Sequence, residues 1–159
     1  YQDVIEMAQA FKTSSVDLAT LSETNIDWRS SAKGKLHEKF QRVYHQIKSS
    51  TSSSIIKYNT IYQPGGTETI ALDKYTSQIT GKGGDIDLGR WSHLELLGKN
   101  GRTIILITVY QLCNQDSQQS GSRTAHAQQV SLLLRQNRTQ SPHKALLDDL
   151  DTKISEWIQ

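Results

Sequence analysis

The hydrophobic residues of this chain recur with two different spacings. Near the start, Val4, Ile5, Ala8 and Phe11 fall on one helical face, which predicts an amphipathic helix over 2–11. Other apolar runs are short and rich in β-branched or aromatic residues, which favours strands. These strands are expected over 16–22, 55–62, 68–72, 90–97 and 103–110. The helical spacing returns in three later segments, so further helices are expected over 30–48, 124–136 and 142–159.

Polar and glycine-rich segments are expected to connect these elements. The Ser/Thr tract Ser49–Ser54 has no hydrophobic period and is interpreted as a loop. Ile79–Gly89 contains four glycines and is also interpreted as a loop. Gly98–Gly101 holds an Asn-Gly pair between two strand-like runs, which predicts a β-hairpin. Ser141 followed by Pro142 is typical of a helix start and fixes where the last helix begins.

The resulting order of elements is α-β-α-β-β-β-β-α-α. Consecutive strands joined by a hairpin exclude a doubly wound parallel sheet and predict a mixed two-sheet α/β sandwich covered by helices. No internal repeat and no shift in composition divides the chain, so residues 1–159 are expected to form a single domain. Because the chain begins at Tyr1, inside a helical pattern and without Met, we expect it to be a piece of a longer protein.

Composition narrows the class of protein without identifying a partner. Hydrophobic residues make up 35 % of the chain and charged residues 21 %, with a net charge of +2, which fits a folded domain rather than disorder. The single cysteine, Cys113, excludes an internal disulfide and a cysteine-cluster metal site. No apolar run approaches the roughly 18 residues of a membrane span and no secretory signal is visible, so an intracellular protein without membrane contact is expected.

Several motifs with well-understood chemistry are missing. Neither Gly65-Gly66-Thr67 nor Gly81–Gly84 is followed by a lysine at P-loop spacing. The five histidines show no i, i+4 pair, so a zinc site is not expected. No serine lies in a GxSxG elbow. Basic residues gather between Arg29 and Lys48, where a solvated helix face is a simpler interpretation than a face that contacts phosphates.

Two residues at strand ends are the strongest candidates for chemistry. Glu23 follows the strand 16–22, and α/β folds place their sites at the carboxyl ends of strands. A carboxylate there suits a hard divalent cation, although an ordinary loop acid explains Glu23 more simply when it is taken alone. Tyr110 ends the strand 103–110, where its hydroxyl could donate to a phosphate. Taken alone, a ring in the core with its hydroxyl in water is the simpler interpretation.

Taken in order, four segments resemble the endonuclease/exonuclease/phosphatase superfamily. Val16–Asn25 is similar to the family's segment in which a strand leads directly into a glutamate. Gly65-Gly66-Thr67 is similar to the family's Gly-Gly-Thr strand. Residues 89–111, from Gly-Arg-Trp-Ser to Val-Tyr-Gln, resemble its hairpin, and 141–150 resemble the helix before its Gly-Asp-x-Asn strand. The sequences Glu-Thr-Asn-Ile-Asp-Trp and Gly-Arg-Trp-Ser most resemble the corresponding segments of the divergent members found beside reverse transcriptases.

The resemblance implies a metal-dependent phosphodiesterase, an endonuclease that acts on nucleic acid and on DNA in particular. The parent would be a retroelement protein with a reverse transcriptase domain. Glu23 matches the glutamate that binds the catalytic Mg²⁺ or Mn²⁺, and Tyr110 matches the active-site tyrosine that orients the scissile phosphate. Asn25, Thr67 and Arg90 lie in matching segments and are candidate substrate contacts.

The chain also departs from the family's pattern. The family's opening asparagine, its Asp and Asn after the last helix and its Ser-Asp-His segment have no counterpart in the 159 residues. We therefore expect an incomplete sandwich with part of an active site, and little or no cleavage by this chain alone. A non-catalytic nucleic-acid-binding or interaction remnant of the same fold is the alternative to the enzyme.

Overall fold

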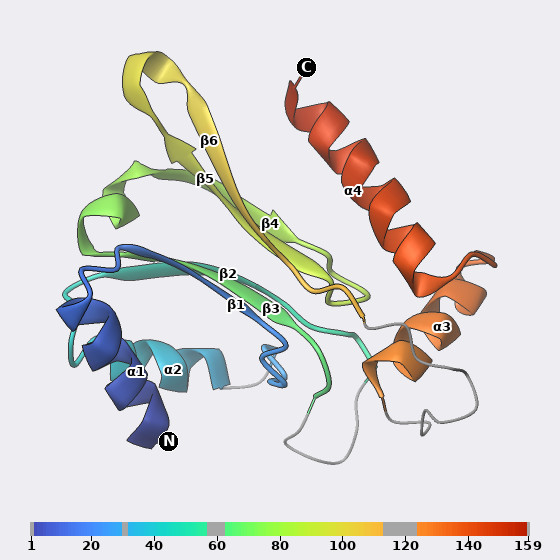
Figure 1. Cartoon of the computed structure of the whole chain (residues 1–159), viewed down its shortest axis with the longest axis horizontal. Coiled ribbons are helices and arrows are strands. Elements are labelled where there is room, and N and C mark those ends of the chain that lie inside the picture. The colour runs from blue at the N-terminus through green and yellow to red at the C-terminus, as the bar shows by residue number, and fades with distance from the viewer. Residues whose placement is uncertain (1, 30–31, 57–62, 113–123, 159) are drawn as a thin grey trace.

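The chain folds into two three-stranded antiparallel sheets that face each other, with helices around them (Figure 1). The computed structural model describes residues 2–29, 32–56, 63–112 and 124–158. In the first sheet, the order of the strands is β1 (Leu18–Ser22), β3 (Thr67–Leu72) and β2 (Ile47–Ser52). In the second sheet, the order is β4 (Ile79–Gly84), β5 (Trp91–Leu97) and β6 (Thr103–Val109). The mixed α/β class expected from the sequence is thereby confirmed.

Two helices cover the outer face of the first sheet. These are α1 (Gln2–Thr13) and α2 (Ala32–Phe40). Ala8 from α1 and Phe40 from α2 are fully buried against Ile70 and Leu72 of β3. Phe11 meets Phe40 edge to face with ring centroids 6.3 Å apart, an arrangement that adds to the burial of apolar area.

The inner faces of the two sheets meet in a layer that changes character along its length. At one end, Ala71 packs with Leu94 and Leu96 in an apolar cluster. Towards the other end, Thr69 Oγ1 lies 2.6 Å from Thr108 Oγ1 and 2.9 Å from Ser92 Oγ. These hydroxyls satisfy one another, which is what a buried polar group requires. The sheets are therefore held together by apolar contacts at one end and by hydroxyls at the other.

The last two helices lie beside the second sheet. They are α3 (Ala125–Arg135) and α4 (Pro142–Ile158). Thr124 caps α3 by accepting a hydrogen bond from the Ala127 N–H, a common N-terminal arrangement. α4 begins at Pro142, as the sequence predicts, and its Trp157 ring lies 4.8 Å from the His93 ring of β5. No helix in the described part of the chain is long and apolar enough to cross a membrane.

The helix expected over 30–48 is wrong beyond Phe40, where α2 ends. Asp73 Oδ1 accepts hydrogen bonds from the His45 and Gln46 N–H groups at 2.8 and 3.1 Å, which draws this backbone out of a helix and towards the first sheet. Tyr44 still joins the same core, so the apolar stripe is genuine even though the helix does not continue along it.

The loop expected over Ser49–Ser54 is also wrong, because Ile47–Ser52 forms β2 and pairs with β3. Ser50 donates a hydrogen bond to the Gly83 carbonyl at 2.6 Å, and Ser52 donates one to the Asp85 carbonyl. Side-chain hydrogen bonds to the second sheet thus hold this strand where hydrophobic side chains would be usual. A period-2 apolar pattern is absent for that reason.

The glycine-rich loop expected over Ile79–Gly89 is a strand over its first six residues, β4. Its glycines leave room for side chains of β5. A Cβ atom at Gly81 would collide with the Glu95 carboxylate, and one at Gly83 would lie 2.7 Å from Cε1 of His93. Of the strand expected over 55–62, Ile55 and Ile56 lie outside any strand, and 57–62 lie outside the described residues, as does Cys113.

The remaining elements follow the sequence prediction closely. β1 forms within the run 16–22, and β3 (Thr67–Leu72) begins one residue before the strand expected over 68–72. β5 and β6 pair in register from Trp91 with Val109 to Leu97 with Thr103. They are joined through the short helix η2 (Lys99–Gly101), in which Asn100 and Gly101 both have positive φ. The Asn-Gly signal therefore predicted the hairpin correctly. A second short helix, η1 (Asp73–Gln78), leads from the first sheet into the second.

Candidate functional site

The candidate residues gather at one end of the two sheets. Antiparallel pairing places Ser22, the last residue of β1, beside Thr67, the first residue of β3. In the second sheet it places Val109, the last residue of β6, beside Trp91. The hydroxyl contacts from Thr69 to Ser92 and Thr108 bring these two ends together. The segments that follow β1, precede β3 and follow β6 therefore lie at the same end of the molecule.

Gly65 lies at the meeting point of these segments. Its N–H donates to Asn25 Oδ1 at 3.0 Å, and its carbonyl accepts from the Asn25 N–H at 2.8 Å. On its other side, a Cβ atom at Gly65 would lie 3.1 Å from Cε1 of Tyr110. With φ at +80°, Gly65 adopts a conformation that favours glycine. Asn25 and Tyr110, which are distant in sequence, thus contact the same glycine.

Glu23 projects from this end into solvent. It follows β1 directly, is exposed, and makes no hydrogen bond or ion pair with any residue that the structure describes. Its φ of 55° is uncommon for a residue that is neither glycine nor asparagine, and Asn25 has φ of 54°. Such conformations cost of order 1–3 kcal/mol each and cluster at functional sites. The hydrogen bonds of Thr24 and Asn25 to Gly66 and Gly65 hold the segment in this conformation.

Tyr110 is half-buried, with its ring against Gly65 and its N–H bonded to the Arg90 carbonyl at 2.7 Å. Thr67 is fully buried between the sheets, and its hydroxyl has no hydrogen-bond partner among the described residues. The structure therefore brings Asn25 and Tyr110 together at Gly65, with Glu23 two residues before Asn25, whereas Thr67 is fully buried at the start of β3. Substrate could reach Thr67 only if Gly66 and its neighbours moved.

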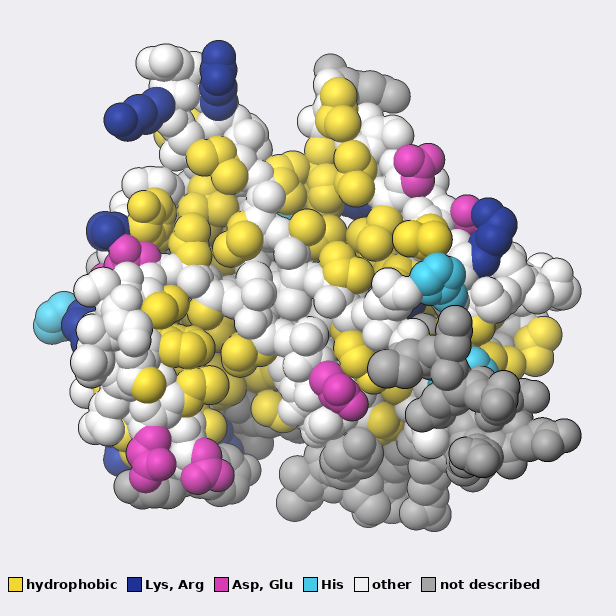
Figure 2. Space-filling view, in the orientation of Figure 1, with side chains coloured by type: hydrophobic (Ala, Val, Ile, Leu, Met, Phe, Trp, Pro, Cys, Tyr) yellow, Lys and Arg dark blue, Asp and Glu magenta, His cyan; other side chains and the backbone are white. Residues whose placement is uncertain are grey.

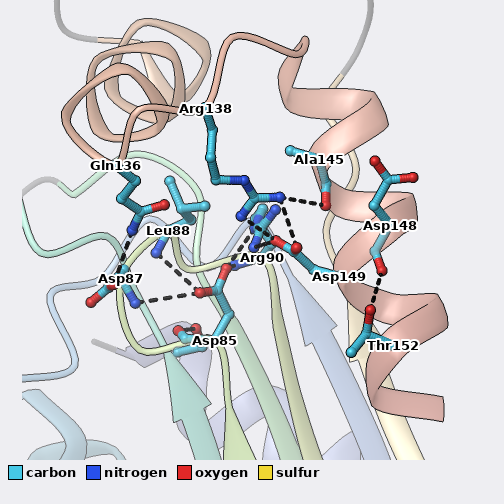
Figure 3. Close-up of polar contacts among 11 residues, drawn as sticks. Asp85, Asp87, Leu88, Arg90, Gln136, Arg138, Ala145, Asp148, Asp149 and Thr152 are labelled. Atoms are coloured by element: carbon cyan, nitrogen blue, oxygen red, sulfur yellow. Dashed lines mark hydrogen bonds and ion pairs between the residues drawn. The ribbon is translucent and has the colours of Figure 1, made fainter. Parts of the chain in front are cut away.

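Arg90 occupies a different setting, inside the protein (Figure 3). Its Nε lies 2.6 Å from Asp85 Oδ2, and its Nη2 lies 2.7 Å from Asp149 Oδ2 of α4. Arg138 adds a second cation 2.7 Å from the other oxygen of Asp149. The side chain of Arg90 thus ties the turn between β4 and β5 to α4, while its carbonyl holds Tyr110.

Opposing effects act on the pKa of the Asp149 carboxyl. Burial acts to raise its pKa, but the hydrogen bonds from Arg138 and Arg90 and the positive charges of both outweigh it, so its pKa lies below the usual value. Asp149 is therefore ionised at neutral pH and holds two guanidinium groups in place. This network stabilises the loops behind Tyr110. Arg90 and Asp85 are buried in it, and Asp149 and Arg138 form its partly exposed side.

Metal coordination needs more than these residues supply. No group of three His, Cys, Asp or Glu side chains close enough to hold a metal ion occurs among the described residues. Mg²⁺ prefers six oxygen ligands in near-octahedral geometry and commonly takes one or two carboxylates with several waters. Glu23 offers one exposed carboxylate. The described residues therefore do not by themselves make the complete cation site that the resemblance implies.

One buried polar cluster was not anticipated from the sequence. Glu68 of β3 is fully buried, and neither carboxylate oxygen has a hydrogen-bond partner among the described residues. His37 Nε2 lies 3.8 Å from Glu68 Oε1 and 2.9 Å from Ser49 Oγ. A Ser-His-acid relay uses opposite ring nitrogens for the serine and the acid. Because one nitrogen faces both groups here, the cluster lacks that geometry. In the sequence, the sign of this cluster is Glu68, an acidic residue inside the otherwise uncharged strand Thr67–Leu72.

Comparisons with protein-family models, with curated proteins and with solved structures give no significant match to this chain. The functional assignment therefore depends on the chain's own residues and on their arrangement.

Proposed function

We propose that this chain is part of a divalent-metal-dependent phosphodiesterase of the endonuclease/exonuclease/phosphatase type. The substrate is nucleic acid, DNA in particular, and the parent is a retroelement protein that also carries a reverse transcriptase. The two facing sheets flanked by helices then correspond to part of that superfamily's sandwich. The observation that carries the proposal is the meeting of Asn25 and Tyr110 on Gly65, beside Glu23. These residues come from three of the segments that carry the resemblance.

The proposal gives each of these residues a distinct task. Glu23 provides one carboxylate ligand for Mg²⁺ or Mn²⁺, because it is exposed and held on a strained segment. Tyr110 directs its hydroxyl to a phosphate oxygen. Asn25 acts by fixing Gly65, since its side-chain oxygen already accepts the Gly65 N–H. When bound, such a metal polarises the phosphoryl oxygen and stabilises the leaving oxygen.

Arg90 is given a supporting task in this proposal. Its Nε and Nη2 bind Asp85 and Asp149 and its Nη1 is buried, so it positions the backbone that carries Tyr110 and does not contact substrate. Thr67 contributes from below the surface, where its unpartnered hydroxyl can accept or donate a hydrogen bond if Gly66 moves. The remaining metal ligands and the general base of the reaction are expected from other parts of the parent protein.

A non-catalytic nucleic-acid-binding remnant of the same fold is the second candidate. The observation that favours it is the lack of a three-residue metal group in the described part of the chain. The two candidates differ in whether Glu23 contacts a metal ion, because a remnant has no need of that carboxylate.

Titration with Mn²⁺, followed by electron paramagnetic resonance of the unbound ion, tests the proposal. We expect weak binding, with a dissociation constant of about 10⁻³ M, because a single carboxylate leaves most of the ligand shell to water. Glu23→Gln should abolish this binding. Glu6→Gln, which removes another exposed acid on α1, should leave it unchanged. Equal affinity in Glu23→Gln and the unaltered chain would refute the proposal, and no binding by either would favour the remnant.

A further inference from the structure

A groove runs between the edge strands of the two sheets, on the side where β2 faces β4. It has a volume of about 370 Å³. Its lining includes Trp28, Arg29, Thr51, Ser53, Lys82 and Gly83, and we call it the serine groove. The Ser/Thr tract of β2 forms one wall and the glycine-rich strand β4 forms the other. The volume lies within the range of about 300–1,000 Å³ that is usual for small-molecule sites.

The hydrogen bonds across the groove remove groups that would repel an anion. The carbonyl oxygens of Gly83 and Asp85 belong to β4 and the turn after it, and they would otherwise present negative dipoles there. Ser50 donates to the first at 2.6 Å and Ser52 donates to the second. The carboxylate of Asp85 is likewise occupied, by Arg90 at 2.6 Å and by the backbone N–H groups of Leu88 and Arg90.

The side chains left over in the groove include donors. Lys82 is exposed and forms no ion pair with any described residue. Arg29 uses its Nε for Asp27 at 2.8 Å, which leaves the rest of its guanidinium for another acceptor. The Ser53 hydroxyl makes no hydrogen bond to the described residues. The lining of the groove thus includes two cations, and its one carboxylate is already neutralised.

We propose that the serine groove binds a phosphate group. A phosphate offers several acceptor oxygens that converge from different directions, and charge-assisted hydrogen bonds from arginine and lysine are the strong contacts for it. The groove has cationic donors on both sides, Arg29 on one side and Lys82 on the other. Its volume also leaves room for a group attached to the phosphate.

An unattached phosphate and a phosphodiester backbone share this chemistry, so the experiment must separate the two. The experiment is a titration of ¹⁵N-labelled chain without metal, first with inorganic phosphate and then with a short single-stranded oligothymidylate. We expect saturable shifts of the Thr51, Ser53 and Gly83 amide signals. Since no metal or cleavage is involved, the outcome is separate from that of the Glu23 proposal.

Variants of groove residues test whether phosphate binds in the serine groove and not elsewhere on the surface. Lys82→Gln should weaken phosphate binding by roughly threefold to tenfold, the effect of one charge-assisted contact at an exposed site. Lys99→Gln, which removes an exposed lysine from the β5–β6 turn, is the matched control and should change nothing. Arg29→Gln tests the opposite side of the groove and should also weaken binding. Oligonucleotide that shifts the same amides and competes with phosphate identifies a nucleic-acid backbone, whereas a response to phosphate alone identifies a small ligand.

Two results would overturn the inference. The first is the absence of saturable shifts at the groove amides with both probes. The second is binding that Lys82→Gln and Lys99→Gln weaken equally, because the attraction would then reflect the overall charge and not the groove.

Discussion

Arg90 is almost fully buried, and two carboxylates share its guanidinium. Asp85 retains hydrogen bonds from the Leu88 and Arg90 N–H groups, but its charge depends on Arg90 for neutralisation. The sequence could not indicate this role, because the partner Asp149 lies far along the chain on α4. By contrast, the positions of Glu23 and Tyr110 at strand ends could be predicted, since they follow directly from the hydrophobic pattern of β1 and β6.

At this scale we expect Arg90→Met to destabilise the fold. Removing one partner of a buried pair leaves the other charge uncompensated, which typically costs 3–5 kcal/mol. Because backbone N–H groups still serve Asp85, we expect about 3 kcal/mol, at the lower end of that range. Lys144→Met breaks an exposed pair with Asp148 and is the control. Urea unfolding measures both, and a loss in Arg90→Met no larger than in Lys144→Met would contradict this account of the buried network.

At the scale of elements, the strands β2 and β4 show where sequence patterns reach their limit. Both strands lie at sheet edges and lack an apolar alternation. Ser50 and Ser52 hold β2 through hydrogen bonds to the second sheet. Gly81 and Gly83 keep β4 small so that side chains of β5 fit. Such reasons for a strand lie in its neighbours, so hydrophobic periodicity within the segment cannot reveal them. The central strands β3 and β5 carry the expected apolar runs and were predictable.

Two glycines with the same φ allow the cost of backbone strain to be measured apart from the cost of a steric clash. Gly89 and Gly101 both have φ of +73°. A Cβ atom at Gly89 would lie 2.6 Å from the Ser54 nitrogen, whereas one at Gly101 would have nothing within 4 Å. Gly101→Ala should therefore lower the free energy of unfolding by about 1 kcal/mol, through left-handed strain alone. Gly89→Ala should lower it by about 2 kcal/mol more, because backbone atoms must move. Thermal unfolding of the two variants measures the difference, and equal losses would show that the turn at Gly89 is placed wrongly.

At the scale of the whole molecule, the second sheet presents an open edge. Its order is β4-β5-β6, so within the described residues nothing pairs with the outer side of β6. Ile104 and Val109 of β6 are exposed, as are Ile154 and Ile158 of α4. Figure 2 shows hydrophobic side chains gathered over this part of the molecule, between the second sheet and α4. An edge strand with exposed apolar residues favours association through strand pairing.

We therefore expect the isolated chain to associate and to have marginal stability. Light scattering should show the average mass rising with concentration. Ile104→Lys should reduce that rise, since a charge on an edge strand opposes pairing. Ile86→Lys, which changes an exposed residue in the turn after β4, should reduce it less. A monomer at every concentration, with a cooperative transition above roughly 65 °C, would contradict this expectation.

The central claim is that Glu23, Gly65 and Tyr110 line one site that binds metal and phosphate. Line broadening of ¹⁵N-labelled chain by substoichiometric Mn²⁺ tests it most directly, because the ion broadens only the signals of residues near it. We predict that the amide signals of Asn25, Gly65 and Tyr110 broaden together and that all three recover in Glu23→Gln. The Gly101 amide, at the far end of the β5–β6 hairpin, should stay sharp. Broadening centred on other acids, or confined to the Glu23 segment without Gly65 and Tyr110, would contradict the claim.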